Sequence, residues 1–563
     1  MVLPFNLSGA GLYADVILTN GIVVTFDEAD SREEAVAIKG DLIIAVGKSE
    51  EISHFAGPNT RIIDLRGRLL TPGLIDSHIH AASGGPYSKY ALDLSYPKIK
   101  SIAEIVGAVK ERVKIASSSD EWIKGVGWDE ALFAEKRYIT RWDLDPVSPK
   151  NPVVLTHTSG HFVVANSAAL KLAGIDQSTP QPKGGTIVKE ENSGEPTGIL
   201  KELASNLMEK HSPRWSVHQL EEGIKYLCQE LVKVGVTSIK DGCTLEGLEG
   251  EAVSAYSSLA RSGKLKVRAY MLWQVKSAKE LDEIKDYLSY QVGDRFRMGG
   301  IKIFMDGSLM GRTAWCYEEF VDPSKGGVDT GNRGYPVIST TEYEKIVAKA
   351  RSLGYQVSTH AIGDRAIDTV LDTYEKTAAS LDKENDCYYT IIHASLATKD
   401  AIRRMQKLGV GVETQSSFLY FLSTAFARAI APDRMARMIP LKSFLDGGVI
   451  VGNGSDYFVA PFAPVYGIWA ACMRKSIAGQ EISKFLGSEE CITVHEVLRT
   501  YTSMAAKCLL FDEKIGTIEK GKLADLVLWA DNLYAIPVEQ IKDAKVAMTI
   551  VGGEVVYDNF TSS

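Results

Sequence analysis

Eight short apolar runs, separated by helical patterns, constrain the fold of this chain more than any other feature. The first begins at residue 69 and ends at His78, and the later runs cover residues 236–240, 266–273, 300–305, 355–359, 388–392, 410–413 and 449–452. Strands that alternate with helices are typical of a parallel sheet, because each parallel connection needs a crossover. Eight such units fit a closed (β/α)8 TIM barrel, so we expect an α/β protein.

Both ends of the chain carry short strand patterns of a different kind. The N-terminal pattern includes a hairpin signal at Asn20-Gly21, and the last 50 residues repeat the same Val- and Ile-rich style. A chain of 563 residues exceeds the size at which one hydrophobic core keeps growing. We therefore predict a small composite β-sandwich domain built from both termini, residues 1–70 and 510–563.

The barrel domain is predicted over residues 71–509. Its first and second strands are separated by far more residues than one βα connection needs. We predict a large insertion after barrel strand one, at about residues 84–230, that forms a cap over the site. The insertion has a strand signal of its own at residues 153–156.

Composition restricts the partners and the compartment. The net charge of −8 and the pI near 5.8 argue against binding to nucleic acid or to an anionic membrane. Seven cysteines without C-x-x-C spacing are typical of reduced thiols. The sequence has no signal-peptide pattern and no apolar window of about 18 residues. We expect a cytoplasmic protein that acts on a small molecule.

The sequence Asp76-Ser77-His78-Ile79-His80 closes the first barrel strand. Side chains alternate between the two faces of a strand, so His78 and His80 point the same way. Two neighbouring imidazoles at a strand end form half of a zinc-type site. The ordinary alternative is a pair of partly exposed loop histidines.

Three later strands also end on possible metal ligands. His360 follows residues 355–359, His393 follows residues 388–392, and Asp456 comes after strand eight. Taken singly, each has a structural alternative, such as a turn or helix cap for Asp456. Because chemistry in a barrel sits where strands end, their joint occurrence favours a ligand set.

Lys302 lies inside the fourth apolar run. Alternation places it on one face with Phe304 and Asp306. A bare ammonium group inside a barrel is costly, so one alternative is a salt bridge to Asp306 or another acid. The other is that desolvation frees the amine to add CO2, which gives a carbamate that bridges two metal ions.

Six motifs together suggest a family: residues 70–80, Gly127-Trp128-Asp129-Glu130, Ser159-Gly160-His161, residues 302–309, His360-Ala361-Ile362-Gly363-Asp364 and Gly454-Ser455-Asp456. On these motifs the chain resembles the amidohydrolase superfamily, and within it the amidohydrolase 3 branch of YtcJ-like and N-substituted formamide deformylase-like proteins. The resemblance extends almost end to end.

The resemblance implies a site with two divalent metal ions, zinc by preference. One ion would be held by His78, His80 and Asp456 and the other by His360 and His393, with carboxylated Lys302 between them. A metal-bound hydroxide would attack a C–N bond of amide type, in an N-acyl amine, formamide, imide or carbamate. Asp456 would accept and deliver the proton. A homodimer is also expected by family analogy.

Other activities remain open. The same metals serve ester, lactone or phosphoester hydrolases. A mononuclear deaminase of the superfamily would lack the strand-four lysine and carry a glutamate soon after the strand-five histidine, whereas this chain has Lys302, and Ala361-Ile362-Gly363 follows His360. A non-catalytic scaffold would be expected to have lost ligands, and all six positions are occupied.

Five further residues are candidates for contact with the substrate. His161 is predicted to hydrogen-bond the reacting carbonyl or its oxyanion. His157, Trp128 and Asp129 are predicted to approach the ligand from the insertion, and Arg312 to bind a substrate carboxylate. Each has a structural alternative, such as packing in the insertion core for Trp128.

Overall fold

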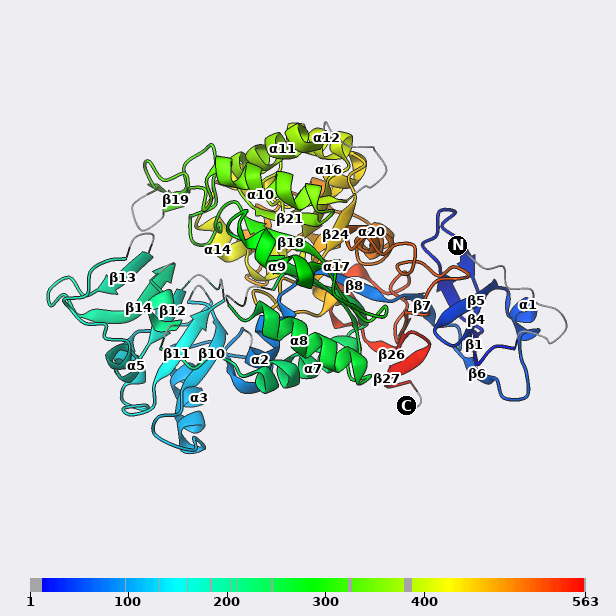
Figure 1. Ribbon diagram of the computed structural model, residues 1–563, viewed down its shortest axis with the longest axis horizontal. Helices are drawn as coiled ribbons and strands as arrows, with labels where there is room; N and C mark the ends of the chain where they lie inside the picture. Colours follow the sequence, from blue (N-terminus) through cyan, green and yellow to red (C-terminus); the bar gives the residue numbers. More distant parts are fainter. Residues whose placement is uncertain are drawn as a thin grey trace.

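The computed structural model describes residues 13–560 except 97, 131, 159, 161, 183–184, 203, 210, 244, 246, 323–326 and 379–386. Its centre is a barrel of parallel strands (Figure 1). Neighbours in the barrel follow the order β8 (Leu74–Ile79), β15 (Val236–Asp241), β16 (Arg268–Gln274), β18 (Phe296–Phe304), β21 (Gln356–Ala361), β22 (Tyr389–His393), β23 (Gly411–Thr414) and β24 (Val451–Asn453).

The barrel is almost closed. The first strand, β8, packs against the last, β24, and the backbone amide of Asp456 donates a hydrogen bond to the carbonyl of His78 at 2.8 Å. Each adjacent pair in the order runs parallel. The predicted (β/α)8 barrel is confirmed.

Helices connect the barrel strands and surround them: α7 (Val217–Lys233), α8 (Glu249–Arg261), α9 (Glu280–Leu288), α10 (Thr340–Ser352), α11 (Asp364–Ala378), α12 (Lys399–Leu408) and α16 (Leu441–Asp446). Helix α7 shows why they form. The hydroxyl of Ser216 caps its first turn, and Leu220, Ile224, Leu227 and Leu231 recur at helical spacing on its buried face. None of the helices among the described residues is long and apolar enough to span a membrane.

Two smaller sheets lie at the ends of the chain. One has the order β5 (Leu42–Gly47), β4 (Ala35–Lys39), β1 (Val16–Thr19), β6 (Arg61–Asp64), and the other β27 (Glu554–Asp558), β26 (Val546–Val551), β25 (Leu526–Trp529), β7 (Leu69–Pro72), β2 (Ile22–Val24), β3 (Arg32–Glu33). The second sheet joins strands from both ends of the sequence. Leu18 and Ile38 from the first sheet share an apolar core with Leu70, Leu526 and Ile550 from the second.

The segment that follows β8 builds a separate six-stranded sheet (Figure 1). Its order is β13 (Gly185–Lys189), β14 (Pro196–Glu202), β12 (Phe162–Ala165), β11 (Val153–His157), β10 (Ile123–Trp128) and β9 (Leu92–Asp93). Helices α3 (Ile102–Lys114) and α5 (Ser167–Leu172) accompany this sheet, while α2 (Ala81–Tyr90) packs on α7 of the barrel. The segment has its own apolar core, with Trp128 and Leu155 at 0% exposure.

Candidate active site

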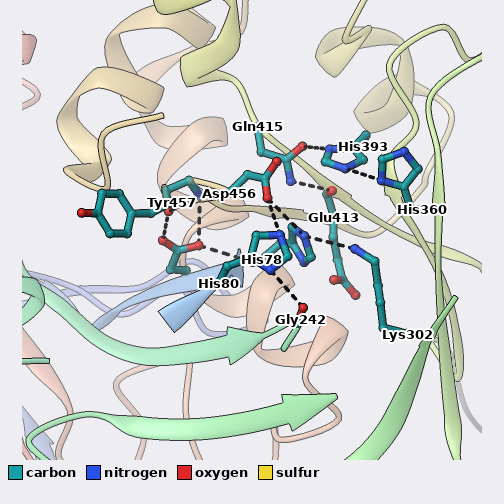
Figure 2. Close-up of polar contacts among 12 residues, drawn as sticks. His78, His80, Gly242, Lys302, His360, His393, Glu413, Gln415, Asp456 and Tyr457 are labelled. Atoms are coloured by element: carbon teal, nitrogen blue, oxygen red, sulfur yellow. Dashed lines mark hydrogen bonds and ion pairs between the residues drawn. The ribbon is translucent and has the colours of Figure 1, made fainter. Parts of the chain in front are cut away.

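The six predicted ligand residues converge at the carboxyl ends of the barrel strands (Figure 2). None is more than 9% exposed. They come from five strands or the loops that directly follow them: His78 and His80 at β8, Lys302 in β18, His360 in β21, His393 at the end of β22, and Asp456 after β24. Parallel strands bring these distant parts of the sequence to one rim.

The first cluster consists of His78, His80 and Asp456. Asp456 Oδ1 lies 2.9 Å from His80 Nε2 and 3.4 Å from His78 Nε2. All three residues offer ligand atoms within 4.8 Å of one another. Metal–nitrogen bonds of about 2.0–2.1 Å at tetrahedral angles place ligand atoms about 3.3 Å apart, so this cluster fits a metal ion.

Burial sets the charges of this cluster. Burial, and after it the nearby Lys302, lower the pKa of His78 well below its usual value. Burial raises the pKa of Asp456, but the adjacent imidazoles of His78 and His80 outweigh the effect of burial and hold that pKa well below its usual value. At neutral pH His78 is therefore neutral and Asp456 ionised, which are the protonation states that bind metals.

The second cluster pairs His360 with His393. His393 Nδ1 lies 2.6 Å from Gln415 Oε1, and His360 Nε2 lies 2.9 Å from the carbonyl oxygen of Gly307. Since the amide nitrogen of Gln415 donates to the carbonyl of Glu413 at 3.1 Å, its oxygen must face His393. His393 Nδ1 and His360 Nε2 therefore carry the ring hydrogens. The other ring nitrogen of each residue, His393 Nε2 and His360 Nδ1, is a bare acceptor.

These two bare acceptors face each other. His393 Nε2 and His360 Nδ1 are 3.0 Å apart. Two lone pairs at this distance repel each other unless a metal cation or a proton binds to the nitrogens. A proton is disfavoured, since burial lowers the pKa of His393 to about 4 and lowers that of His360 well below its usual value. The donor chemistry of the pair therefore fits a divalent metal ion.

His80 is oriented in the same way. Its Nδ1 lies 2.9 Å from the carbonyl oxygen of Gly242, so Nε2 is left as the acceptor that faces Asp456. Gly242, Gly307 and Gln415 thus fix the tautomers of three imidazoles. None of these three residues is among those predicted from the sequence. Gln415 directly follows β23, and its place at a strand end is the signal that identifies it.

Lys302 is fully buried between the two clusters. Its Nζ lies 3.4 Å from His78 Nε2 and 4.6 Å from the centre of the Phe304 ring. Burial lowers its pKa to about 8. The alternative salt bridge to Asp306 is not formed, because Asp306 accepts backbone N–H groups instead, among them those of Trp315 and Gly363.

A cavity of about 280 Å³ opens beside the two clusters. His80, Lys302, His360, His393 and Asp456 form part of its wall. The ligand residues can therefore be reached by a small molecule.

The predicted substrate contacts lie elsewhere. Trp128 is fully buried in the core of the insertion, where its indole N–H donates to the carbonyl of Leu155 at 3.1 Å. Asp129 lines a second cavity of about 210 Å³, whose wall also contains residues that follow β23 and β24. Of these two residues, only Asp129 lines one of the two cavities.

The remaining three candidates for substrate contact are His157, Arg312 and His161. His157 is 5% exposed, and its Nε2 lies 3.1 Å from Glu130 Oε2. Arg312, in the loop after β18, lines neither of these two cavities. His161 lies outside the described residues. Trp128, Asp129 and His157 lie together, since the rings of Trp128 and His157 are 4.8 Å apart and Asp129 and His157 offer ligand atoms within 4.8 Å of each other. None of the four described candidates lines the cavity of about 280 Å³ beside the ligand residues.

The barrel and its rim of histidines place the chain among barrel enzymes that use metal-ligating strand ends. The chain belongs to the amidohydrolase family, whose family model matches residues 61–557, and this confirms the resemblance. It is 31% identical to YtcJ of Bacillus subtilis over 96% of this chain and 98% of that protein. It is 28% identical to the N-substituted formamide deformylase of Arthrobacter pascens, over 97% and 98%.

A solved structure has the same architecture. The metal-dependent hydrolase of Pyrococcus horikoshii, whose activity is uncharacterised, superimposes with a TM-score of 0.74 and 26% identity, over 93% of this chain and 99% of that one. Family membership and this likeness identify the chain as a metal-dependent hydrolase of the amidohydrolase type.

Proposed function

We propose that this protein hydrolyses a C–N bond of amide type, in an N-acyl amine, formamide, imide or carbamate, with two divalent metal ions. The observation that carries the proposal is the facing pair of bare acceptors on His360 and His393, beside the cluster of His78, His80 and Asp456. The name of the Arthrobacter relative, an N-substituted formamide deformylase, supports the bond type.

In this proposal His78, His80 and Asp456 hold one ion, and His360 and His393 hold the other. When bound, the ions supply Lewis acidity, which polarises a carbonyl and lowers the pKa of water. Zinc suits this set of nitrogen and oxygen donors.

Lys302 completes the site as a carbamate. Its neutral amine nitrogen attacks the carbon of CO2 and loses a proton. The product is a carbamate attached through Nζ, and its two oxygens share one negative charge. The carbamate oxygens would be available to the metal ions, because Nζ lies 3.4 Å from His78 Nε2, lines the cavity and is completely buried. The change replaces a buried cation, which is costly beside metal ions, by an anion that binds them.

Asp456 moves the proton. Its carboxylate is ionised, since the adjacent imidazoles of His78 and His80 overcome the effect of burial and keep its pKa low. It accepts a proton from the attacking water and passes that proton to the leaving nitrogen, so that the amine departs neutral. Asp456 lines the cavity and is within reach of a bound substrate.

A substrate panel on zinc-loaded protein tests the proposal. N-acyl amines, formamides, imides and esters are compared by kcat/KM in the wild type, in His360→Asn, and in the control His54→Asn, which changes an exposed histidine directly after helix α1 (Ser49–Ser53). We expect an amide-type compound to be the best substrate, with activity lost in His360→Asn and kept in His54→Asn. An ester that exceeds every amide, or a fully metal-loaded chain without hydrolysis, contradicts the proposal.

A further inference from the structure

The cavity beside the ligand residues has apolar walls from four separate loops. Phe304 and Leu309 come from the end of β18, Ile362 follows β21, Phe418 follows β23, and Phe458 follows β24. These apolar residues are far apart in the sequence but line the same cavity. An apolar wall of this kind is complementary to an apolar part of a ligand.

Among the wall residues that the structure describes, charged groups are confined to the ligand set. Among the described residues that line this cavity, the ionisable ones are His80, Lys302, His360, His393 and Asp456. The other polar side chains there are Ser308 and Ser395. Among these described residues, a second charge on the substrate would therefore meet no charged partner outside the ligand set, which is unfavourable. The two divalent ions of the proposed site further disfavour a cation.

The apolar wall reaches the reacting centre itself. The Phe418 ring stacks on His393 with centroids 6.2 Å apart, and the Phe304 ring lies 4.8 Å from that of His360. Phe426 extends the wall at 6.4 Å from Phe418. Hence the group bonded directly to the scissile carbonyl or nitrogen contacts aromatic rings, which favour a planar apolar partner.

The volume limits the size of that group. A cavity of about 150 Å³ in another protein holds one benzene molecule. The cavity here, of about 280 Å³, has room for one ring and a short amide.

We infer that the substrate is a small, uncharged amide whose substituent next to the scissile bond is a single apolar, preferably aromatic, group. This inference rests on the proposed function and narrows its substrate class. It excludes N-acyl amino acids and other substrates with a carboxylate near the amide. It also removes the need for Arg312 as a carboxylate partner, in agreement with the position of Arg312 outside the cavity wall.

Three ring amides that differ only at the para position test the inference on zinc-loaded full-length protein. The groups are methyl, sulfonate (a poor metal ligand) and ammoniomethyl. Binding is followed by ligand-observed NMR and turnover by release of the amine or ammonia. We expect the methyl compound to bind at least about 100-fold more tightly than either charged one.

Each outcome is decisive. A charged compound that binds within tenfold of the methyl compound, or the absence of binding by all three, overturns the inference. If the methyl compound binds selectively but none is hydrolysed, the proposed bond type fails whereas the selectivity of the cavity stands. Selective binding with selective hydrolysis supports both.

Substitutions in the cavity wall test whether the selectivity for an apolar substituent arises in this cavity. Phe426→Leu and Phe426→Ala shorten a wall residue of this cavity, whereas Phe421→Ala shortens a residue of the neighbouring cavity of about 210 Å³. We expect the Phe426 variants to weaken binding of the methyl compound by about 10-fold or more, with metal content unchanged, and Phe421→Ala to alter it by less than about threefold. Equal effects of the Phe426 and Phe421 variants contradict the assignment to this cavity.

Discussion

At the scale of single residues, Asp456 combines two tasks, because its carboxylate faces two imidazoles and also lines the cavity. We predict that Asp456→Asn, which keeps the size and one oxygen ligand, lowers kcat by about 10²–10⁴-fold through loss of the proton acceptor. Parallel measurement of kcat and metal content checks this. Full kcat with both metals bound would show that another group moves the proton.

His393 makes the metal-free protein sensitive to acid. Burial lowers its pKa to about 4 in the folded state, against 6.5 when unfolded, so the unfolded chain binds more protons in this window. The free energy of unfolding should therefore fall by about 3 kcal/mol as the pH drops from 6.5 to 4. Urea unfolding at several pH values measures the slope. His393→Asn should show a smaller slope, and an unchanged one contradicts the assignment.

Lys302 should react with CO2 in a pH-dependent manner. Its pKa of about 8 implies that the neutral amine rises about tenfold between pH 7 and pH 9, whereas a lysine of ordinary pKa stays almost fully protonated. At a fixed concentration of dissolved ¹³CO2, a ¹³C carbamate signal should form faster at pH 9, and Lys302→Met should lack it. Full metal occupancy without any carbamate signal contradicts the modification.

At the scale of elements, a buried ion pair ties β15 to β23 across the barrel. Lys240 Nζ lies 2.5 Å from Glu413 Oε1, and both side chains are 0% exposed. We predict that Glu413→Gln destabilises the fold by about 3–5 kcal/mol, because it leaves the ammonium buried without its counter-charge. Joint replacement by Lys240→Met and Glu413→Met should recover most of the loss. Denaturant titration distinguishes these outcomes, and a single-variant cost below about 1 kcal/mol contradicts the reasoning.

The strands and the ligand residues could be predicted from sequence for one reason. Apolar runs mark buried strands, and parallel strands carry their terminal residues to a common rim, so His78, His360 and His393 could be placed without coordinates. The groups that orient these imidazoles could not be predicted from the sequence. The partners of His80 and His360 are the backbone carbonyls of Gly242 and Gly307, which leave no trace in residue type.

The positions of side chains in the insertion after β8 were harder to predict from the sequence. Trp128 and His157 stand beside polar residues in Gly-rich or Thr-rich stretches, so the sequence left open both a role at the ligand and a structural role. In the fold, Trp128 is fully buried in the core of the insertion, and His157 stacks on Phe162 with ring centroids 4.0 Å apart. Which face of the inserted sheet meets the barrel depends on packing between elements that no local spacing encodes.

At the scale of the whole molecule, the metal site exists only when the barrel is closed. Its ligand residues lie between positions 78 and 456 and meet through five different strands. Bound metal should therefore stabilise the fold as a whole, because the unfolded chain cannot hold an ion with the same affinity. We predict that chelation lowers the melting temperature of the zinc-loaded protein by several degrees. The apo form of His360→Asn/His393→Asn should show a smaller difference from its zinc-loaded form, and equal shifts contradict the coupling.

The central claim is that two clusters on one rim bind two divalent ions. Inductively coupled plasma mass spectrometry of zinc-loaded, dialysed protein measures the number of bound metal ions directly. The account predicts about two metal ions per wild-type chain and about one in His360→Asn/His393→Asn, which keeps the cluster of His78, His80 and Asp456. A wild-type chain that retains at most one ion, or a double variant that still retains two, would contradict it.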